Sequence, residues 1–244
     1  MSIIEPMSYV IISGGIFAGA VVSGLVGFAF SAVAGAILLH VLPPTEAVPL
    51  MMACSIVTQA VSLVALRGTV QWRCSPLLIA AGALGIVPAL YLLHNIDARI
   101  FRIGFGAFLA VYASYMLLRP ATAYLRNTGR LHDVVVGFGG GLVGGLTAMP
   151  GALPTIWCEL RGMPKDQQRG VVQPYITAMQ LFALALMLSH NSLSKTALLN
   201  LTFSLPALAA GAALGVLIFR RIGDAIFRHT VLGVLLVAGL VLVV

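Results

Sequence analysis

Long apolar blocks follow one another along this chain and are separated by short basic loops. About 20 consecutive apolar residues in a helix are enough to span the hydrocarbon layer of a bilayer. The pattern therefore predicts an all-α integral membrane protein. Eight blocks can be distinguished, at about residues 8–42, 46–66, 75–94, 101–118, 132–159, 170–189, 196–219 and 228–244.

The first and fifth blocks differ from the others in length and composition. The first covers 35 residues, long enough for a hairpin, and the fifth covers 28, which suits two half-helices meeting inside the membrane. The fifth contains GGLVGGLTAMPGALPTIW (residues 140–157), in which Pro150 lacks an N–H and Gly151 permits unusual dihedral angles. These features predict a broken, re-entrant hairpin in each block, with tips near residues 24–35 and at Met149-Pro150-Gly151.

Short matches between the two halves of the chain occur in the same order. They predict an internal duplication within one transmembrane domain: a first repeat (residues 1–118), a linker (residues 119–131) and a second repeat (residues 132–244). The matches pair Gly24-Leu25-Val26-Gly27 with Gly141-Leu142-Val143-Gly144, Pro44-Thr45-Glu46 with Pro164-Lys165-Asp166, Gln59 with Gln180, and Ile100-Phe101-Arg102 with Ile226-Phe227-Arg228.

Positive charges indicate how the blocks cross, because cytoplasmic loops collect Lys and Arg. If all eight blocks crossed once, the fourteen charges would divide six against eight. If the first and fifth blocks re-enter on the side from which they came, the division is eleven against three. The second arrangement gives each half three crossings, so the two repeats are inverted relative to each other, as in many secondary transporters. It predicts a multi-pass protein of the bacterial cytoplasmic (inner) membrane with both termini in the periplasm.

Composition supports the membrane class and argues against a nucleic-acid partner. Hydrophobic residues make up 60% of the 244 positions, charged residues make up 9%, and the mean hydropathy is +1.04. The net charge of +7 comes from loop residues that suit lipid headgroups, so we expect membrane lipid and no nucleic acid as a partner. The three cysteines stand far apart without metal-type spacing, and we expect neither a metal nor a cofactor. A homo-oligomer is possible.

The two hairpin tips are the first candidate site. A half-helix that starts after each tip directs free N–H groups and the positive end of its dipole into the interior, which suits an anion. This geometry needs no buried lysine or arginine. The residues Arg161, Lys165 and Arg169 are accordingly interpreted as inside-positive anchors or, alternatively, as a funnel that concentrates anions at the cytoplasmic mouth.

Neutral polar side chains at depth are the second candidate feature. One face of the second block carries Ser55, Thr58, Gln59 and Ser62, and one face of the sixth carries Gln173, Thr177 and Gln180. Hydroxyls in membrane helices often bond to their own backbone, but a buried glutamine amide needs partners. The predicted substrate-binding residues are Gly27, Phe28, Ser31, Gln59, Thr147, Pro150, Gly151, Gln173 and Gln180.

The chain resembles the TauE/SafE sulfite-exporter family of small duplicated bacterial membrane transporters. The resemblance lies in SGLVGFAFSAVAGAILLHVLPPTEAV (residues 23–48) and GGLVGGLTAMPGALPTIWCELRGMPKDQQRGVVQPY (residues 140–175), where a Gly-rich break leads through an apolar half-helix to a turn and the next span. Many members carry a run like G-x-G-G-G at each break, whereas this chain has GFAFSA and GGLTAMPG. The resemblance implies export of sulfite or a sulfur-containing organic anion.

We therefore expect a secondary transporter of a small anion, with alternating access at a midplane site formed by the two breaks. Alternatives are a small-carboxylate transporter and a membrane scaffold or assembly subunit without transport. An intramembrane enzyme is not expected, because the chain has no H-E-x-x-H or G-x-S-x-G sequence and its acids and histidines fall in loops or at block ends.

Overall fold

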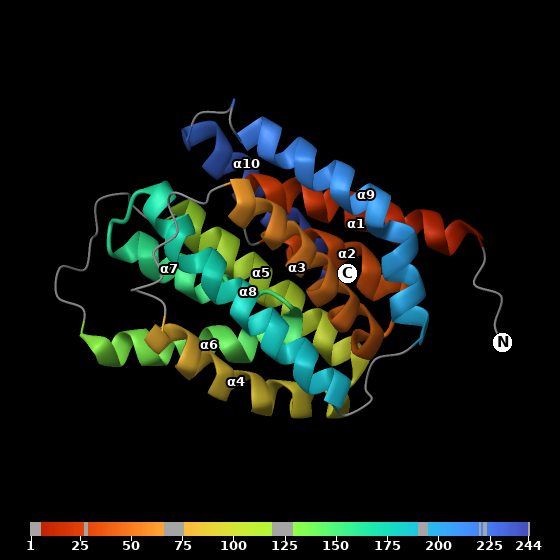
Figure 1. The fold of residues 1–244 in the computed structure, drawn as a ribbon, viewed down its shortest axis with the longest axis horizontal. Coiled ribbons are helices and arrows are strands. Elements are labelled where there is room, and N and C mark those ends of the chain that lie inside the picture. Colours follow the sequence, from red (N-terminus) through yellow and green to blue (C-terminus); the bar gives the residue numbers. More distant parts are fainter. Residues whose placement is uncertain are drawn as a thin grey trace.

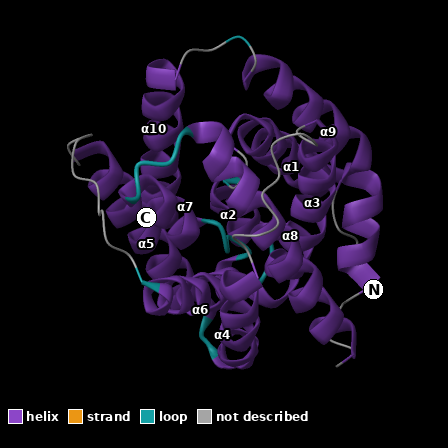
Figure 2. Cartoon of the chain, turned by 60° about the vertical axis from the view of Figure 1, so that its left-hand side comes forward, coloured by secondary structure: helices purple, strands orange, loops and turns teal. Residues whose placement is uncertain are grey.

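The computed structural model describes residues 6–26, 29–65, 76–118, 129–189, 195–219, 221 and 224–243. These residues form helices joined by short connections, without a strand among them (Figure 2). The all-α prediction is confirmed. The helices are α1 (Pro6–Val26), α2 (Phe30–Val41), α3 (Pro44–Ala65), α4 (Pro76–Asn95), α5 (Ala98–Leu118), α6 (Arg130–Thr147), α7 (Ala152–Leu160), α8 (Lys165–Ser189), α9 (Lys195–Phe219) and α10 (Asp224–Val243).

Helices α1 and α2 form the first predicted hairpin. A methyl group on Gly15 would lie 3.2 Å from Ile37, and one on Gly19 would lie 2.9 Å from Ala34 Cβ. Positions later in α1 therefore face positions earlier in α2, which is antiparallel packing. The glycines permit it because they leave room for the neighbouring helix.

Helices α6 and α7 form the second hairpin in the same way. A methyl group on Gly140 would lie 3.1 Å from Pro154, and one on Gly144 would lie 2.5 Å from Pro150. The fifth block is therefore not a continuous rod but turns back on itself after Thr147. The prediction that the first and fifth blocks are broken hairpins is confirmed.

The hairpins pack mainly against the opposite half of the chain. Helix α1 lies along α9, and α6 lies along α4 (Figure 1). Helices α5 and α10 pack together, as do α3 and α8. The entering helix of each hairpin is thus covered by a helix from the other half of the chain. The two halves cannot be separated without exposing both hairpins.

The glycine contacts of the helix pair α1 and α9 recur at constant offsets in the helix pair α6 and α4. Gly85 in α4 and Gly211 in α9 contact residues at matching positions of α6 and α1. Gly145 in α6 and Gly24 in α1 likewise contact residues at matching positions of α4 and α9. Phe138 lies 121 positions after Phe17, and Ala212 and Gly215 lie 126 positions after Ile86 and Ala89. The contacts are Gly85 with Phe138, Gly211 with Phe17, Gly145 with Ile86 and Ala89, and Gly24 with Ala212 and Gly215.

If the halves are duplicated as predicted, this packing favours a different alignment from the Gly-Leu-Val-Gly match. That match set Gly24 against Gly141, 117 positions apart, whereas the packing sets Gly24 against Gly145. The difference of four residues is about one helical turn. Glycines recur about every four residues in both helices. A short sequence match can therefore pair glycines that lie one helical turn away from the pair indicated by the packing. The inverted orientation of the two halves stays a prediction.

The outer surface has the character expected in a bilayer. Among the described residues, four helices are long and apolar enough to cross a membrane: Pro76–Asn95, Ala98–Leu118, Gln167–Ser189 and Leu199–Ile218. Large side chains such as Leu84, Val111 and Leu118 point outward and are mostly exposed. A water-soluble monomer rarely exposes so much contiguous apolar surface, and lipid would cover it here.

Candidate functional site

The two hairpin tips touch each other. Ser31, at the start of α2, donates its hydroxyl hydrogen to the carbonyl oxygen of Ala148, after the last residue of α6, over 2.7 Å. Gln180 of α8 donates from Nε2 to the same oxygen over 3.3 Å. All three residues are buried. Ser31, Gln180 and the second break, which the sequence predicted as parts of one site, therefore converge on a single carbonyl group.

The carbonyl of Ala148 is available because α6 ends in an unusual conformation. Ala148 has φ 56° and ψ 24°, the left-handed conformation that commonly ends helices, and its N–H donates to Gly144 O over 2.8 Å. Pro150, two residues later, cannot continue the helix. The sequence analysis expected the unusual dihedral angles at Gly151, but that residue has φ −74°. The left-handed residue is Ala148.

Both half-helices begin at the tips without side-chain caps. Ala29 precedes α2 and Gly151 precedes α7, and neither offers a side-chain hydrogen bond to the first turn. The residues that begin the helices, Phe30 and Ala152, are buried. The first N–H groups of a helix have no partner inside the helix. In α7 the Ala152 N–H bonds to Met149 O over 3.5 Å and Pro154 has no N–H, so the backbone donors near the Ser31–Ala148 contact come mainly from α2.

Arg169 is buried next to the first tip, which corrects the sequence interpretation. Its Nη2 donates to Leu25 O over 2.8 Å and to Gly24 O over 3.3 Å. These carbonyls belong to the last turn of α1, the negative end of that helix dipole. The sequence analysis treated Arg169 as a loop residue and expected no buried basic group. The guanidinium instead brings a full positive charge into the tip region.

A stripe of buried polar side chains runs along α8. Arg169, Gln173 and Gln180 are four and then seven residues apart, so they lie on one side of the helix over about 16 Å. Within the described part of the chain, Gln173 Nε2 and Gln180 Oε1 have no hydrogen-bond partner. Thr177 bonds locally to the Gln173 carbonyl over 2.9 Å, as hydroxyls in membrane helices often do. The two glutamines thus retain unused bonding capacity inside the protein.

The polar face of α3 lies beside the first hairpin. Ser55, Thr58 and Gln59 are all buried. The Thr58 hydroxyl donates to Ser55 O over 2.8 Å and lies 3.3 Å from the hydroxyl of Ser23 in α1. Gln59 is the next residue of α3 and corresponds to Gln180 at the offset of 121 that relates α1 to α6.

The remaining predicted site residues fall into three groups. Pro150 and Gly151 form the buried turn between α6 and α7, as predicted. Thr147 ends α6, and its hydroxyl bonds back to Val143 O over 2.8 Å, so its bond is local. Gly27 and Phe28 lie outside the described residues.

A polar and aromatic cluster holds the open end of the second hairpin together. Trp157 of α7 donates from Nε1 to Asp133 Oδ1 in α6 over 2.8 Å. The His132 ring stacks on Trp157 with centroids 5.6 Å apart, and the Arg161 guanidinium lies 5.8 Å from the Trp157 ring centroid. Arg161 Nη1 also lies 3.6 Å from Asp133 Oδ1. The cluster ties the two legs of the hairpin at the end opposite its tip.

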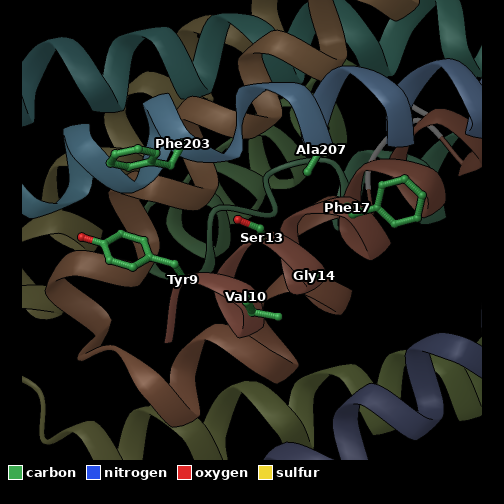
Figure 3. A pocket seen from close by; sticks show the side chains of 7 residues that line it. All are labelled: Tyr9, Val10, Ser13, Gly14, Phe17, Phe203 and Ala207. Carbon is green, nitrogen blue, oxygen red and sulfur yellow. The ribbon is translucent and has the colours of Figure 1, made fainter. Parts of the chain in front are cut away.

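A groove lies between α1 and α9, away from this site (Figure 3). Its volume is about 790 Å³, and Tyr9 and Phe203 meet there edge to face with ring centroids 5.5 Å apart. Apart from the hydroxyls of Tyr9 and Ser13, its lining is apolar. The residues around it are Tyr9, Val10, Ser13, Gly14, Phe17, Phe203 and Ala207.

An all-helical membrane bundle with two broken hairpins that meet at a buried polar site defines the class of polytopic membrane transporters. Within that class, the model of the sulfite exporter TauE/SafE family matches residues 11–242. The chain belongs to this family, whose members are transporters. No curated protein and no solved structure matches the chain.

Proposed function

We propose that this protein is a secondary transporter of a small anion, sulfite or an organosulfonate, which binds where the two hairpin tips meet. The observation that carries the proposal is the pair of buried, uncapped helix N-termini on either side of the Ser31–Ala148 hydrogen bond. A helix N-terminus binds anions because its N–H groups point at the ligand and its dipole favours negative charge.

The side chains around the tips complement the backbone donors. Arg169 contributes a positive charge, and Gln173 contributes an amide donor that no described residue uses. Ser31 and Gln180 bond to Ala148 O in this structure and could turn their donors to a bound oxyanion instead. An oxyanion that leaves water needs such charge-assisted hydrogen bonds to replace its hydration.

The way in which the halves interlock supports alternating access. Each hairpin packs along a helix of the opposite half. In this proposal the α1–α2 and α6–α7 tips belong to two bodies that share one site. Rocking of one body against the other would open the site to each side in turn. In this proposal the repeats are inverted, the protein lies in the bacterial cytoplasmic membrane, and both termini are periplasmic. One chain carries both tips, so a homo-oligomer would be an assembly of complete transport units.

A small carboxylate is the second candidate solute. Arg169 favours it as well as sulfite, because the planar guanidinium fork matches both carboxylate and other oxyanion geometries. Competition for uptake of labelled sulfite by acetate, succinate and methanesulfonate separates the two. Stronger inhibition by the carboxylates would identify a carboxylate transporter.

Flux through proteoliposomes of the purified chain tests the proposal. We expect labelled sulfite to cross wild-type vesicles and to be lost in the variant Pro150→Leu with Gly151→Leu, which removes the turn before α7. Arg169→Gln should also reduce flux strongly, because it removes the positive charge. The matched control is Arg99→Gln, which removes an exposed arginine at the start of α5.

Two results would contradict the assignment. Equal sulfite flux in the wild type and the tip variant, at equal amounts of inserted protein, would show that the tips do not form the transport site. No flux of any anion in the wild type would favour a scaffold or assembly subunit.

A further inference from the structure

Asn200 of α9 carries a buried side-chain amide that is not part of the tip site. It is fully buried, and among the described residues neither its Oδ1 nor its Nδ2 has a hydrogen-bond partner. An amide transferred from water to apolar surroundings without a partner costs several kcal/mol. A missing partner for both ends of this amide therefore points to a ligand.

Two hydroxyl groups accompany the amide. Ser204 lies one helical turn after Asn200 on the same side of α9 and is also buried. Its Oγ lies 3.5 Å from the Oγ of Ser13 in α1, a long contact that leaves bonding capacity on both hydroxyls. Figure 3 shows Ser13 between the two helices, at the groove. We call Asn200, Ser204 and Ser13 the Asn200 site.

The corresponding helix pair in the other half shows that packing does not require these polar groups. At the offsets of 121 and 126, Ser13 corresponds to Val134 of α6 and Ser204 to Leu78 of α4. The pair α6 and α4 packs closely with these apolar side chains. The hydroxyls between α1 and α9 are therefore an addition to the fold, which supports a binding role.

The chemistry of the site selects a protonated oxyacid. An amide offers one acceptor and two N–H donors, so it pairs in two places with an oxygen acceptor and an O–H on the same ligand. A fully deprotonated oxyanion would use the donor but place its charge against the Oδ1 lone pairs. The titratable side chains described on the helices packed against α9 are Tyr9 of α1 and Glu46 and Cys54 of α3, and none of them bonds to Asn200.

We propose that the Asn200 site is a second binding site for the transported oxyanion and takes it in its protonated form. This inference rests on the proposed anion transport and deepens it. In this view the solute carries its own proton past α1 and α9, with its O–H donating to Asn200 Oδ1 and its other oxygens accepting from Nδ2 and the hydroxyls. Proton movement then needs no carboxylate within the membrane.

Equilibrium binding of sulfite to the purified full chain tests the inference at an acidic and an alkaline pH. Protonated sulfite predominates at the first and the dianion at the second. We expect Asn200→Leu to weaken sulfite binding roughly tenfold at acidic pH, since hydrogen bonds to charged groups are lost, and to change it little at alkaline pH. Methanesulfonate has no acidic hydrogen at either pH, so its binding should change less.

A second test variant carries Ser13→Val and Ser204→Leu, which copies the apolar pair of α6 and α4. We expect it to fold as stably as the wild type and to weaken acidic sulfite binding in the same direction as Asn200→Leu. Unchanged sulfite affinity at both pH values in Asn200→Leu, with a raised Tm, would overturn the inference and leave a buried amide only. Equal losses for sulfite and methanesulfonate at both pH values would overturn the preference for the protonated form.

Flux and binding separate the two proposals. Absent flux in wild-type proteoliposomes contradicts the transport function. The difference in sulfite affinity at acidic pH between the wild type and Asn200→Leu tests the Asn200 site independently of flux. Absence of sulfite binding to the wild type at both pH values would overturn the Asn200 site.

Discussion

The hydroxyl of Ser31 donates to the carbonyl oxygen of Ala148 over 2.7 Å, although 117 positions separate the two residues in the chain. One residue opens the returning helix of the first hairpin, and the other closes the entering helix of the second. The bond joins the two tips directly in a region where both residues are shielded from the surroundings. In the proposed transport cycle, movement of one hairpin relative to the other changes the distance between these two residues, so the bond is a direct test of the mechanism.

Ser31→Ala tests the contact between the tips. The change removes one donor to Ala148 O and leaves Gln180 as the other. We expect a loss of about 1 kcal/mol in stability, as for one buried hydrogen bond, and a clear fall in sulfite flux. Thermal unfolding in detergent and proteoliposome flux measure the two effects. Ser189→Ala, which removes an exposed hydroxyl bonded only to Leu186 O nearby, is the control, and equal flux in both variants would refute a role for Ser31.

Gly141→Ala tests the close packing of α6 on α4. A methyl group there would lie 2.8 Å from Gly82 Cα and closer still to the Gly82 carbonyl, so the helices must separate. We expect a destabilisation of about 2 kcal/mol or more, seen as a lower Tm. Gly104→Ala in α5 has no heavy atom within 4 Å of the added group and should raise stability by about 0.5–1 kcal/mol, because alanine favours helices. Similar Tm values for the two variants would contradict this packing.

Ala148→Gly tests the left-handed end of α6. Glycine adopts φ 56° without the steric cost that a Cβ imposes, so we expect a gain of about 1 kcal/mol with flux retained, because the carbonyl group stays in place. Ala148→Val should lower stability, since a β-branched side chain is strained at positive φ. Thermal unfolding of the three proteins gives the order. A stability for the valine variant equal to that of the glycine variant would argue against the left-handed conformation.

Trp157→Phe tests the cluster at the open end of the second hairpin. Phenylalanine keeps a ring for His132 to stack on but removes the N–H that donates to Asp133. We expect a loss of about 1.5–3 kcal/mol, the range for hydrogen bonds to charged groups, and more rapid protease cleavage near Arg161. Asp133→Asn keeps an acceptor for the indole N–H and should cost less. If Asp133→Asn is the more damaging change, the ion pair with Arg161 and not the indole hydrogen bond holds the legs together.

The apolar blocks, and the breaks in the first and fifth of them, could be predicted from the sequence because they depend on local composition. Whether a segment enters lipid is decided by about 20 neighbouring side chains, and whether its helix breaks is decided by proline and glycine within it. The breaks in the first and fifth blocks therefore follow from the order of the amino acids alone. The importance of the glutamine at position 180 follows in the same way, because a long amide in an apolar run must find a partner.

The burial of Arg169, the register of the two halves and the unpartnered amide of Asn200 were decided only by the tertiary structure. Arg169 stands near the start of α8, where an anchoring role fits the sequence equally well. It is buried because the last turn of α1, more than 140 positions away, offers its carbonyls at that level. Contacts of this kind depend on which helix faces which, and hydropathy along one chain segment contains no information about the partner.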